Sequence, residues 1–114
     1  MNLLLVALGG FIGSITRYSI SIKWNKKLPA TWIANITGSM FLAFLYHFYT
    51  EGSLSDEIWL LLGVGFCGAY TTFSTFGNET LQLLLHQQYI YAGIYVLSSF
   101  SVSILAVFTI LTFL

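Results

Sequence analysis

Apolar residues dominate four long segments of the chain, and short polar segments separate them. A membrane-spanning helix needs about 20 mostly apolar residues, because each residue adds about 1.5 Å to its length. The pattern predicts transmembrane helices at residues 3–21, 30–50, 58–85 and 91–114. Because the connections are short, we expect consecutive helices to run antiparallel. The sequence therefore predicts an all-α membrane protein, with residues 1–114 forming a single four-helix transmembrane domain.

The third predicted span differs from the others. It is longer than one crossing requires, and glycines and hydroxyl residues interrupt its apolar pattern over residues 65–78. Unpaired backbone groups are tolerated at membrane depth only where they are buried in protein or line a polar cavity. Broken helices of this kind commonly hold ions or substrates in transporters. We therefore predict that the third helix is broken near the membrane centre, and that the break is the functional site.

Hydrogen-bond donors on and around this break are candidate site residues. Asn35 lies within the second span, where a carboxamide must find partners inside the bundle. Ser74 and Thr75 follow the break and offer hydroxyl groups. On the fourth span a polar residue recurs every four positions, which forms a line down one helix face, at Tyr95, Ser99 and Ser103. These side chains can donate hydrogen bonds to a polar guest, although serines in membrane helices also commonly bond to their own backbone or pack against a neighbour.

Two aromatic and two charged residues complete the candidates. Phe73 and Phe76 are three residues apart and share a helix face, and the positive edge of an aromatic ring can approach an anion. Arg17 lies near the end of the first span, where it either extends toward the interface or pairs within the protein. Glu79 follows the break, and an ionisable residue inside a span is a functional candidate by default.

Composition narrows the possible functions. The chain is 57% hydrophobic and only 7% charged, whereas about 25% of residues are charged in an average soluble domain. Its net charge is zero, so we expect no nucleic-acid partner. The single Cys67 and the lack of a Cys/His cluster argue against structural zinc and thiol redox chemistry. No nucleophile, base and orienting group occur at workable spacing, so we expect no enzyme activity.

The few charged residues are distributed unevenly. The four basic residues lie at or in the first connection, at Arg17, Lys23, Lys26 and Lys27, and three acidic residues lie in the second, at Glu51, Asp56 and Glu57. The positive-inside rule then places the first and third connections in the cytoplasm. Tryptophan and tyrosine residues gather near the predicted span ends, as an interfacial belt requires, at Trp24, Trp32, Tyr46, Tyr49, Trp59, Tyr89 and Tyr91.

The segments at residues 65–76, 9–18 and 29–39 together resemble the motifs of one known family, the Fluc/CrcB family of microbial fluoride channels. Residues 65–76, GFCGAYTTFSTF, resemble the signature of its third helix. Residues 9–18 are similar to its first-helix glycine–arginine motif, with Ser14 where alanine is common. Residues 29–39 are similar to its second-helix motif, although Ala30 replaces the usual glycine and Ala34 the usual valine. The resemblance extends over the whole chain in length, order and number of spans.

This resemblance implies a dimer of two antiparallel four-helix subunits of the dual-topology type. Fluoride pathways would run along the subunit boundary, around a central structural sodium ion (Na+). Gly68 and Thr71 would supply backbone carbonyls to the sodium ion. The fluoride pathway would include Asn35, Phe73, Phe76, Ser74, Thr75, Tyr95, Ser99 and Ser103. Arg17 and Glu79 would have a vestibule or structural role.

The resemblance implies a fluoride-selective passive channel in the inner (plasma) membrane, which exports cytoplasmic fluoride and so reduces its toxicity. Its partners would be fluoride, the lipid bilayer and a second antiparallel subunit. Because the charge bias favours one orientation, that subunit is either an identical chain or a paralogue inserted the opposite way. Two alternatives stay open: a small multidrug-resistance-type proton-coupled transporter, which shares the chain length and four spans, and a non-conducting partner subunit of a heterodimeric channel.

Overall fold

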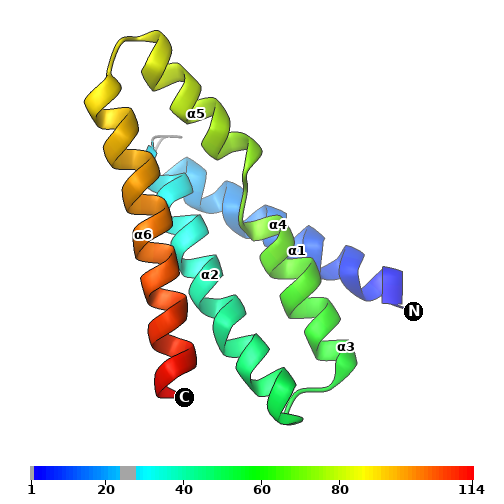
Figure 1. Ribbon diagram of the computed structural model, residues 1–114. Helices are drawn as coiled ribbons and strands as arrows, with labels where there is room; N and C mark the ends of the chain where they lie inside the picture. Colours follow the sequence, from blue (N-terminus) through cyan, green and yellow to red (C-terminus); the bar gives the residue numbers. More distant parts are fainter. Residues whose placement is uncertain (1, 24–27) are drawn as a thin grey trace.

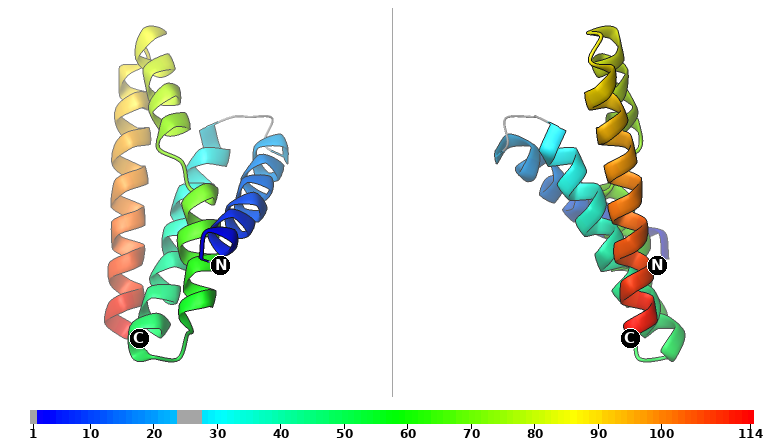
Figure 2. Two further views of the ribbon diagram at one scale, coloured as in Figure 1. Left: turned by 90° about the vertical axis from the view of Figure 1, so that its right-hand side faces the viewer. Right: turned by 60° about the vertical axis from the view of Figure 1, so that its left-hand side comes forward.

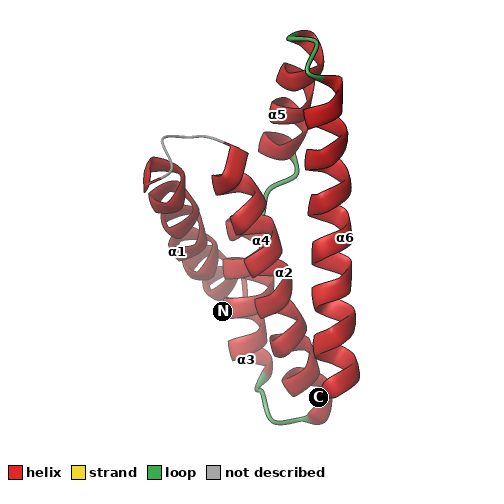
Figure 3. Cartoon of the chain, turned by 90° about the vertical axis from the view of Figure 1, so that its left-hand side faces the viewer, coloured by secondary structure: helices red, strands yellow, loops and turns green. Residues whose placement is uncertain are grey.

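The computed structural model describes residues 2–23 and 28–114, and every regular element in these ranges is a helix (Figure 3). The elements are α1 (Asn2–Lys23), α2 (Leu28–Glu51), α3 (Asp56–Ile58), the wide-turned π-helix η1 (Trp59–Cys67), α4 (Gly68–Tyr70), α5 (Ser74–Leu85) and α6 (Tyr89–Phe113). Within the described ranges, α1, the segment Asp56–Leu85 and α6 are long and apolar enough to cross a membrane. The chain is therefore an all-helical, multi-pass membrane protein.

The helices pack as a series of neighbouring pairs around α2. Helices α2 and α6 lie side by side, and η1 packs against both α1 and α2 (Figure 1). Helix α5 packs along the first part of α6. As a result, α1 and the α5–α6 pair splay apart on either side of α2 (Figure 2).

Backbone contact between α1 and η1 depends on glycine. A Cβ atom at Gly9 would overlap the carbonyl oxygen of Leu61, and one at Gly13 would overlap that of Phe66. From the opposite helix, a Cβ at Gly65 would lie 2.6 Å from the Val6 carbonyl oxygen. Small residues allow this close approach of membrane helices, where packing replaces the hydrophobic effect as the driving force.

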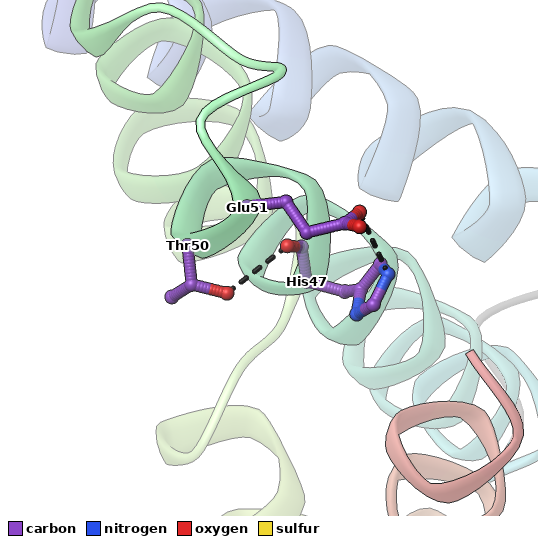
Figure 4. A network of polar contacts seen from close by, with 3 residues as sticks. All are labelled: His47, Thr50 and Glu51. Carbon is purple, nitrogen blue, oxygen red and sulfur yellow. Dashed lines mark hydrogen bonds and ion pairs between the residues drawn. The ribbon is translucent and has the colours of Figure 1, made fainter.

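The C-terminal end of α2 carries a polar network (Figure 4). His47 Nε2 lies 3.0 Å from Glu51 Oε2, and the Thr50 hydroxyl donates to the His47 carbonyl at 3.0 Å. The Tyr49 hydroxyl donates to Asp56 at 2.9 Å, across the connection to α3. Charged and aromatic groups of this kind are typical of a helix end at the membrane–water interface.

The first connection bears on the predicted charge bias. Of its basic residues, Arg17 and Lys23 belong to α1. Lys26 and Lys27, together with Trp24, lie outside the described residues. The orientation in the membrane therefore stays a prediction from sequence.

Regular helix stops between α4 and α5. Residues 71–73, which we call the break, are not helical, and Thr71 is extended with φ −81° and ψ 156°. Figure 1 shows the chain passing from α4 to α5 through this non-helical segment. The break lies within the stretch of glycines and hydroxyl residues that interrupts the apolar pattern. Its depth in the bilayer stays a prediction.

Candidate functional site

Asn35 of α2 holds the break at two points. Its Nδ2 donates to the Thr72 carbonyl at 2.9 Å, and the Thr72 amide donates to Asn35 Oδ1 at 2.8 Å. Gly38, about one turn further along α2, permits this approach, because a Cβ there would overlap the Thr71 methyl group. A carboxamide carries two N–H groups, so the pairing with Thr72 leaves one Asn35 N–H for a further acceptor.

Thr72 also organises the start of α5 through its side chain. The Thr72 hydroxyl accepts a hydrogen bond from the Thr75 amide at 3.2 Å. In an uninterrupted α-helix, the Thr72 amide would donate to the Gly68 carbonyl and the Thr75 amide to the Thr71 carbonyl. Both amides donate to side chains instead. The carbonyls of Gly68 and Thr71 therefore lack the donors that a continuous helix would supply.

A cavity of about 320 Å³ opens beside the break. This central cavity is lined by α2, the break, α5 and α6, through Asn35, Gly38, Ser39, Leu42, Thr71, Thr72, Phe73, Phe76, Ser99, Phe100 and Ser103. None of these side chains is ionisable. Ser99 is 6% exposed, and its hydroxyl oxygen has no hydrogen-bond partner among the described residues. An unpaired buried hydroxyl is costly, which makes the cavity a candidate binding site for a polar guest.

The two phenylalanines at this cavity have different surroundings. Phe76 is 8% exposed and packs against Tyr95, with ring centroids 5.0 Å apart. It also meets Phe100 edge-on, at 5.9 Å and an interplanar angle of 88°. Phe73 is 80% exposed on the surface of the single chain. Phe76 is thus fixed by its neighbours, whereas Phe73 projects outward from the break.

Four other candidates form two contacts outside the central cavity. The Tyr95 hydroxyl donates to Glu79 Oε1 at 3.2 Å, which joins α6 to α5. Arg17 Nη1 donates to the Thr75 hydroxyl at 3.5 Å. These last two residues line a second cavity of about 260 Å³, with Tyr18, Ser21, Ala30 and Thr31. Arg17 therefore reaches from α1 to the start of α5, and makes a contact inside the protein.

The candidate residues are thus divided among several places. Asn35, Thr71, Phe73, Phe76, Ser99 and Ser103 meet at the central cavity. Tyr95 lies in line with the two serines but bonds to Glu79. Gly68 is exposed on α4, with no atom within 4 Å of a Cβ built there. The side chain of Ser74 lies outside the described part of the chain.

Sequence reasoning missed two residues that organise the site. Thr72 was not singled out, although a threonine three residues before a helical amide is a typical N-terminal capping pattern. Trp32 was interpreted as an interfacial aromatic, but its indole N–H donates to the Ser98 hydroxyl at 3.0 Å. Ser98 precedes Ser99, so this bond ties α2 to α6 next to the central cavity.

The fold and the site define a class: a multi-pass helical membrane protein with a largely apolar cavity that contains amide and hydroxyl groups and lies beside the non-helical residues 71–73. The chain matches the family model described as "CrcB-like protein, Camphor Resistance (CrcB)" over residues 4–111, and it belongs to this CrcB family. The family resemblance found in the sequence is therefore confirmed.

Relatives with curated names cover nearly the same length. The chain is 44% identical over 99 residues to "Fluoride-specific ion channel FluC" of Methanococcus maripaludis, which covers 84% of this chain and 81% of that protein. It is 41% identical over 112 residues to the protein of the same name from Shewanella sp. (strain W3-18-1), covering 94% and 90%. It is also 41% identical over 114 residues to the one from Bacteroides fragilis (strain YCH46), covering 93% and 90%. These relatives are named as ion channels rather than enzymes.

Proposed function

We propose that this protein is a fluoride-selective passive ion channel that exports fluoride from the cytoplasm across the inner membrane. The observation that carries the proposal is the central cavity, in which amide, hydroxyl and aromatic groups meet beside the break and no side chain is ionisable. A cavity lined by no carboxylate exerts no like-charge repulsion on an anion, and its amide and hydroxyl groups can replace part of the anion's hydration. Membership in the CrcB family and the names of the relatives support fluoride as the anion.

The donors at the cavity suit the chemistry of fluoride. The ion is small and strongly hydrated, so a pathway must replace water with donors that are individually too weak to trap it. The second Asn35 N–H and the Ser99 and Ser103 hydroxyls are such donors. The edges of Phe73 and Phe76 add weak positive potential, while their bulk limits the entry of larger hydrated anions.

Export needs no coupled energy source. In acidic surroundings fluoride enters a cell as neutral HF, which dissociates at cytoplasmic pH and leaves the ion inside. A negative membrane potential then drives the anion outward through an open pathway. Passive conduction therefore lowers cytoplasmic fluoride and reduces its toxicity.

A structural sodium ion fits the carbonyl oxygens at the break. The Gly68 and Thr71 carbonyls would hold it, because the amides of Thr72 and Thr75 donate to side chains instead of to them. Main-chain carbonyls of unwound membrane helices are typical Na+ ligands. The ion would neutralise carbonyl oxygens that are costly to leave unpaired in the membrane.

A second, antiparallel subunit would complete the pathway. Phe73 is 80% exposed and Gly68 is also exposed in the single chain, so both are available to a partner. The basic residues of the first connection favour one orientation, which supports a paralogue of opposite orientation as an alternative to a second identical chain. A chain that requires such a paralogue would act as one subunit of a heterodimeric channel.

Fluoride efflux from liposomes that contain only this polypeptide tests the proposal. We expect efflux to start when a potassium ionophore removes the opposing voltage, and to proceed without a proton gradient. Efflux that requires proton exchange for a cation would identify a small multidrug-resistance-type transporter instead. Efflux only after addition of a paralogous chain would assign this chain to a heterodimer.

Phe73→Ile and Phe76→Ile are expected to reduce fluoride efflux with different accompanying effects. Phe76 is packed against Tyr95 and Phe100, so its replacement also lowers stability, by about 1 kcal/mol. Phe73 is exposed, so its replacement should lower efflux with little change in stability of the single subunit. Liposome efflux and thermal unfolding in detergent measure the two effects. Wild-type efflux in both variants would remove the aromatic rings from the pathway.

A further inference from the structure

We infer that Asn35 and Thr72 create the cation site by diverting two backbone amides away from the Gly68 and Thr71 carbonyls. This inference rests on the proposed function, because it takes sodium as the cation. It assigns both side chains a positioning role that is separate from conduction. Asn35 would then serve the anion pathway and the cation site at once, and the Thr72 hydroxyl would act on the cation site through the Thr75 amide.

The first diversion comes from a different helix. Asn35 Oδ1 accepts the Thr72 amide at 2.8 Å, and Asn35 Nδ2 donates to the Thr72 carbonyl at 2.9 Å. This pair satisfies both polar backbone groups of Thr72 inside the protein, which a break in a membrane helix requires. The Thr72 amide is then no longer available to Gly68. The conformation of the break is therefore imposed in part by α2.

The second diversion is local. The Thr72 hydroxyl accepts the Thr75 amide at 3.2 Å, so α5 begins without a bond from that amide to the Thr71 carbonyl. The Thr71 hydroxyl does not take part, because it donates to the Cys67 carbonyl at 2.8 Å. Two neighbouring threonines therefore have distinct roles. Thr71 offers its carbonyl, and Thr72 keeps that carbonyl free of an amide partner.

The inference makes a prediction about sodium that can be measured separately from fluoride conduction. When Thr72 loses its hydroxyl, the Thr75 amide can return to the Thr71 carbonyl and compete with the cation. One such competing hydrogen bond should weaken sodium binding by about tenfold. Serine in place of threonine keeps the hydroxyl and should keep the affinity.

The test compares Thr72→Val with Thr72→Ser in detergent. Thermal unfolding is followed while sodium chloride replaces N-methylglucamine chloride at constant ionic strength, because a ligand that binds the folded state raises its stability. We expect the sodium concentration for half-maximal stabilisation to rise about tenfold in Thr72→Val. It should stay at the wild-type value in Thr72→Ser, which keeps the hydroxyl that accepts the Thr75 amide.

Asn35→Leu removes the first diversion and should abolish the sodium response. If that variant does not fold, the Thr72 pair decides the question alone. Hydrogen exchange provides a second readout: in sodium-free solution the Thr75 amide should be better protected in Thr72→Val than in Thr72→Ser.

A sodium response in Thr72→Val equal to that of the wild type would overturn the inference, and so would a wild-type protein that does not respond to sodium. Fluoride efflux from liposomes, measured on the same wild-type preparation, distinguishes these outcomes from a failure of the channel proposal. Efflux without a sodium response would leave the fluoride pathway intact and remove the cation site.

Discussion

Asn35→Asp is expected to reduce fluoride efflux about a thousandfold while the protein still folds. The substitution keeps the size of the side chain and an oxygen that can accept the Thr72 amide. It replaces Nδ2, which donates to the Thr72 carbonyl, with a carboxylate oxygen at the edge of the central cavity, so that the bond from the Thr72 amide alone would hold the break. A negative charge about 4 Å from a fluoride ion costs about 4 kcal/mol at an effective dielectric constant of about 20. That energy corresponds to about a thousandfold loss of occupancy.

The measurement is fluoride release from liposomes, with the oligomeric state checked by size-exclusion chromatography. Asn2→Asp is a matched control, because it introduces the same charge at an exposed position near the start of α1. We expect the control to conduct like the wild type. Unchanged efflux in a folded Asn35→Asp protein would place Asn35 outside the anion pathway, and its two bonds to Thr72 would then be its whole role.

An interruption of the third span could be predicted from sequence because the cause of such an interruption is local. Glycines and hydroxyl residues within an apolar span leave few ways to satisfy the backbone in lipid. The predicted polar stretch, residues 65–78, contains the non-helical residues 71–73. Ser99 and Ser103, one turn apart on α6, also meet at one cavity, as helical periodicity allows. Phe73 and Phe76 line the same cavity, but the expectation that they share a helix face was wrong, because Phe73 lies in the non-helical break.

The partners of these residues could not be predicted, because they depend on tertiary contacts. The bonds between Asn35 and Thr72 join positions 37 residues apart, and hydropathy carries no information on such pairing. For the same reason, the bond from Trp32 to Ser98 was not predicted, and Trp32 was interpreted only as an aromatic residue of the membrane–water interface. Whether Ser98 or Ser99 meets α2 depends on the rotation of α6 about its axis, which a largely apolar helix does not reveal in its sequence.

The π-helical form of η1 was also not predicted from the sequence. The third span was expected to consist of two half-helices, and its first half contains a nine-residue π-helix, η1. A π-helix forms when an extra residue is accommodated within a turn, and it often marks a functional site. No simple residue pattern signals it. The close packing of α1 at Gly9 and Gly13 became evident only from the contacts with Leu61 and Phe66.

Gly9→Ala is expected to prevent normal folding, because α1 and η1 touch through their backbones at this residue. The added methyl group would overlap the Leu61 carbonyl oxygen, which belongs to a helix and cannot rotate away as a flexible side chain can. Overpacking commonly costs about 1–3 kcal/mol and can exceed that where backbone must move. We expect a loss of at least about 3 kcal/mol in stability, seen as a large fall in the yield of monodisperse protein and in its thermal unfolding temperature.

Gly10→Ala is the matched control for this prediction. The substitution is the same, on the same helix, and it raises intrinsic helix propensity equally. A Cβ at Gly10 would lie 3.8 Å from the Gly65 carbonyl oxygen and 3.9 Å from the Ala69 Cβ, which are ordinary contacts. We therefore expect Gly10→Ala to fold and conduct fluoride normally. Equal stability of the two variants would contradict the close crossing of α1 and η1. The crossing of α1 and η1 also helps to position the candidate site, because η1 leads directly into α4 and the break. Equal stability would therefore remove that support as well.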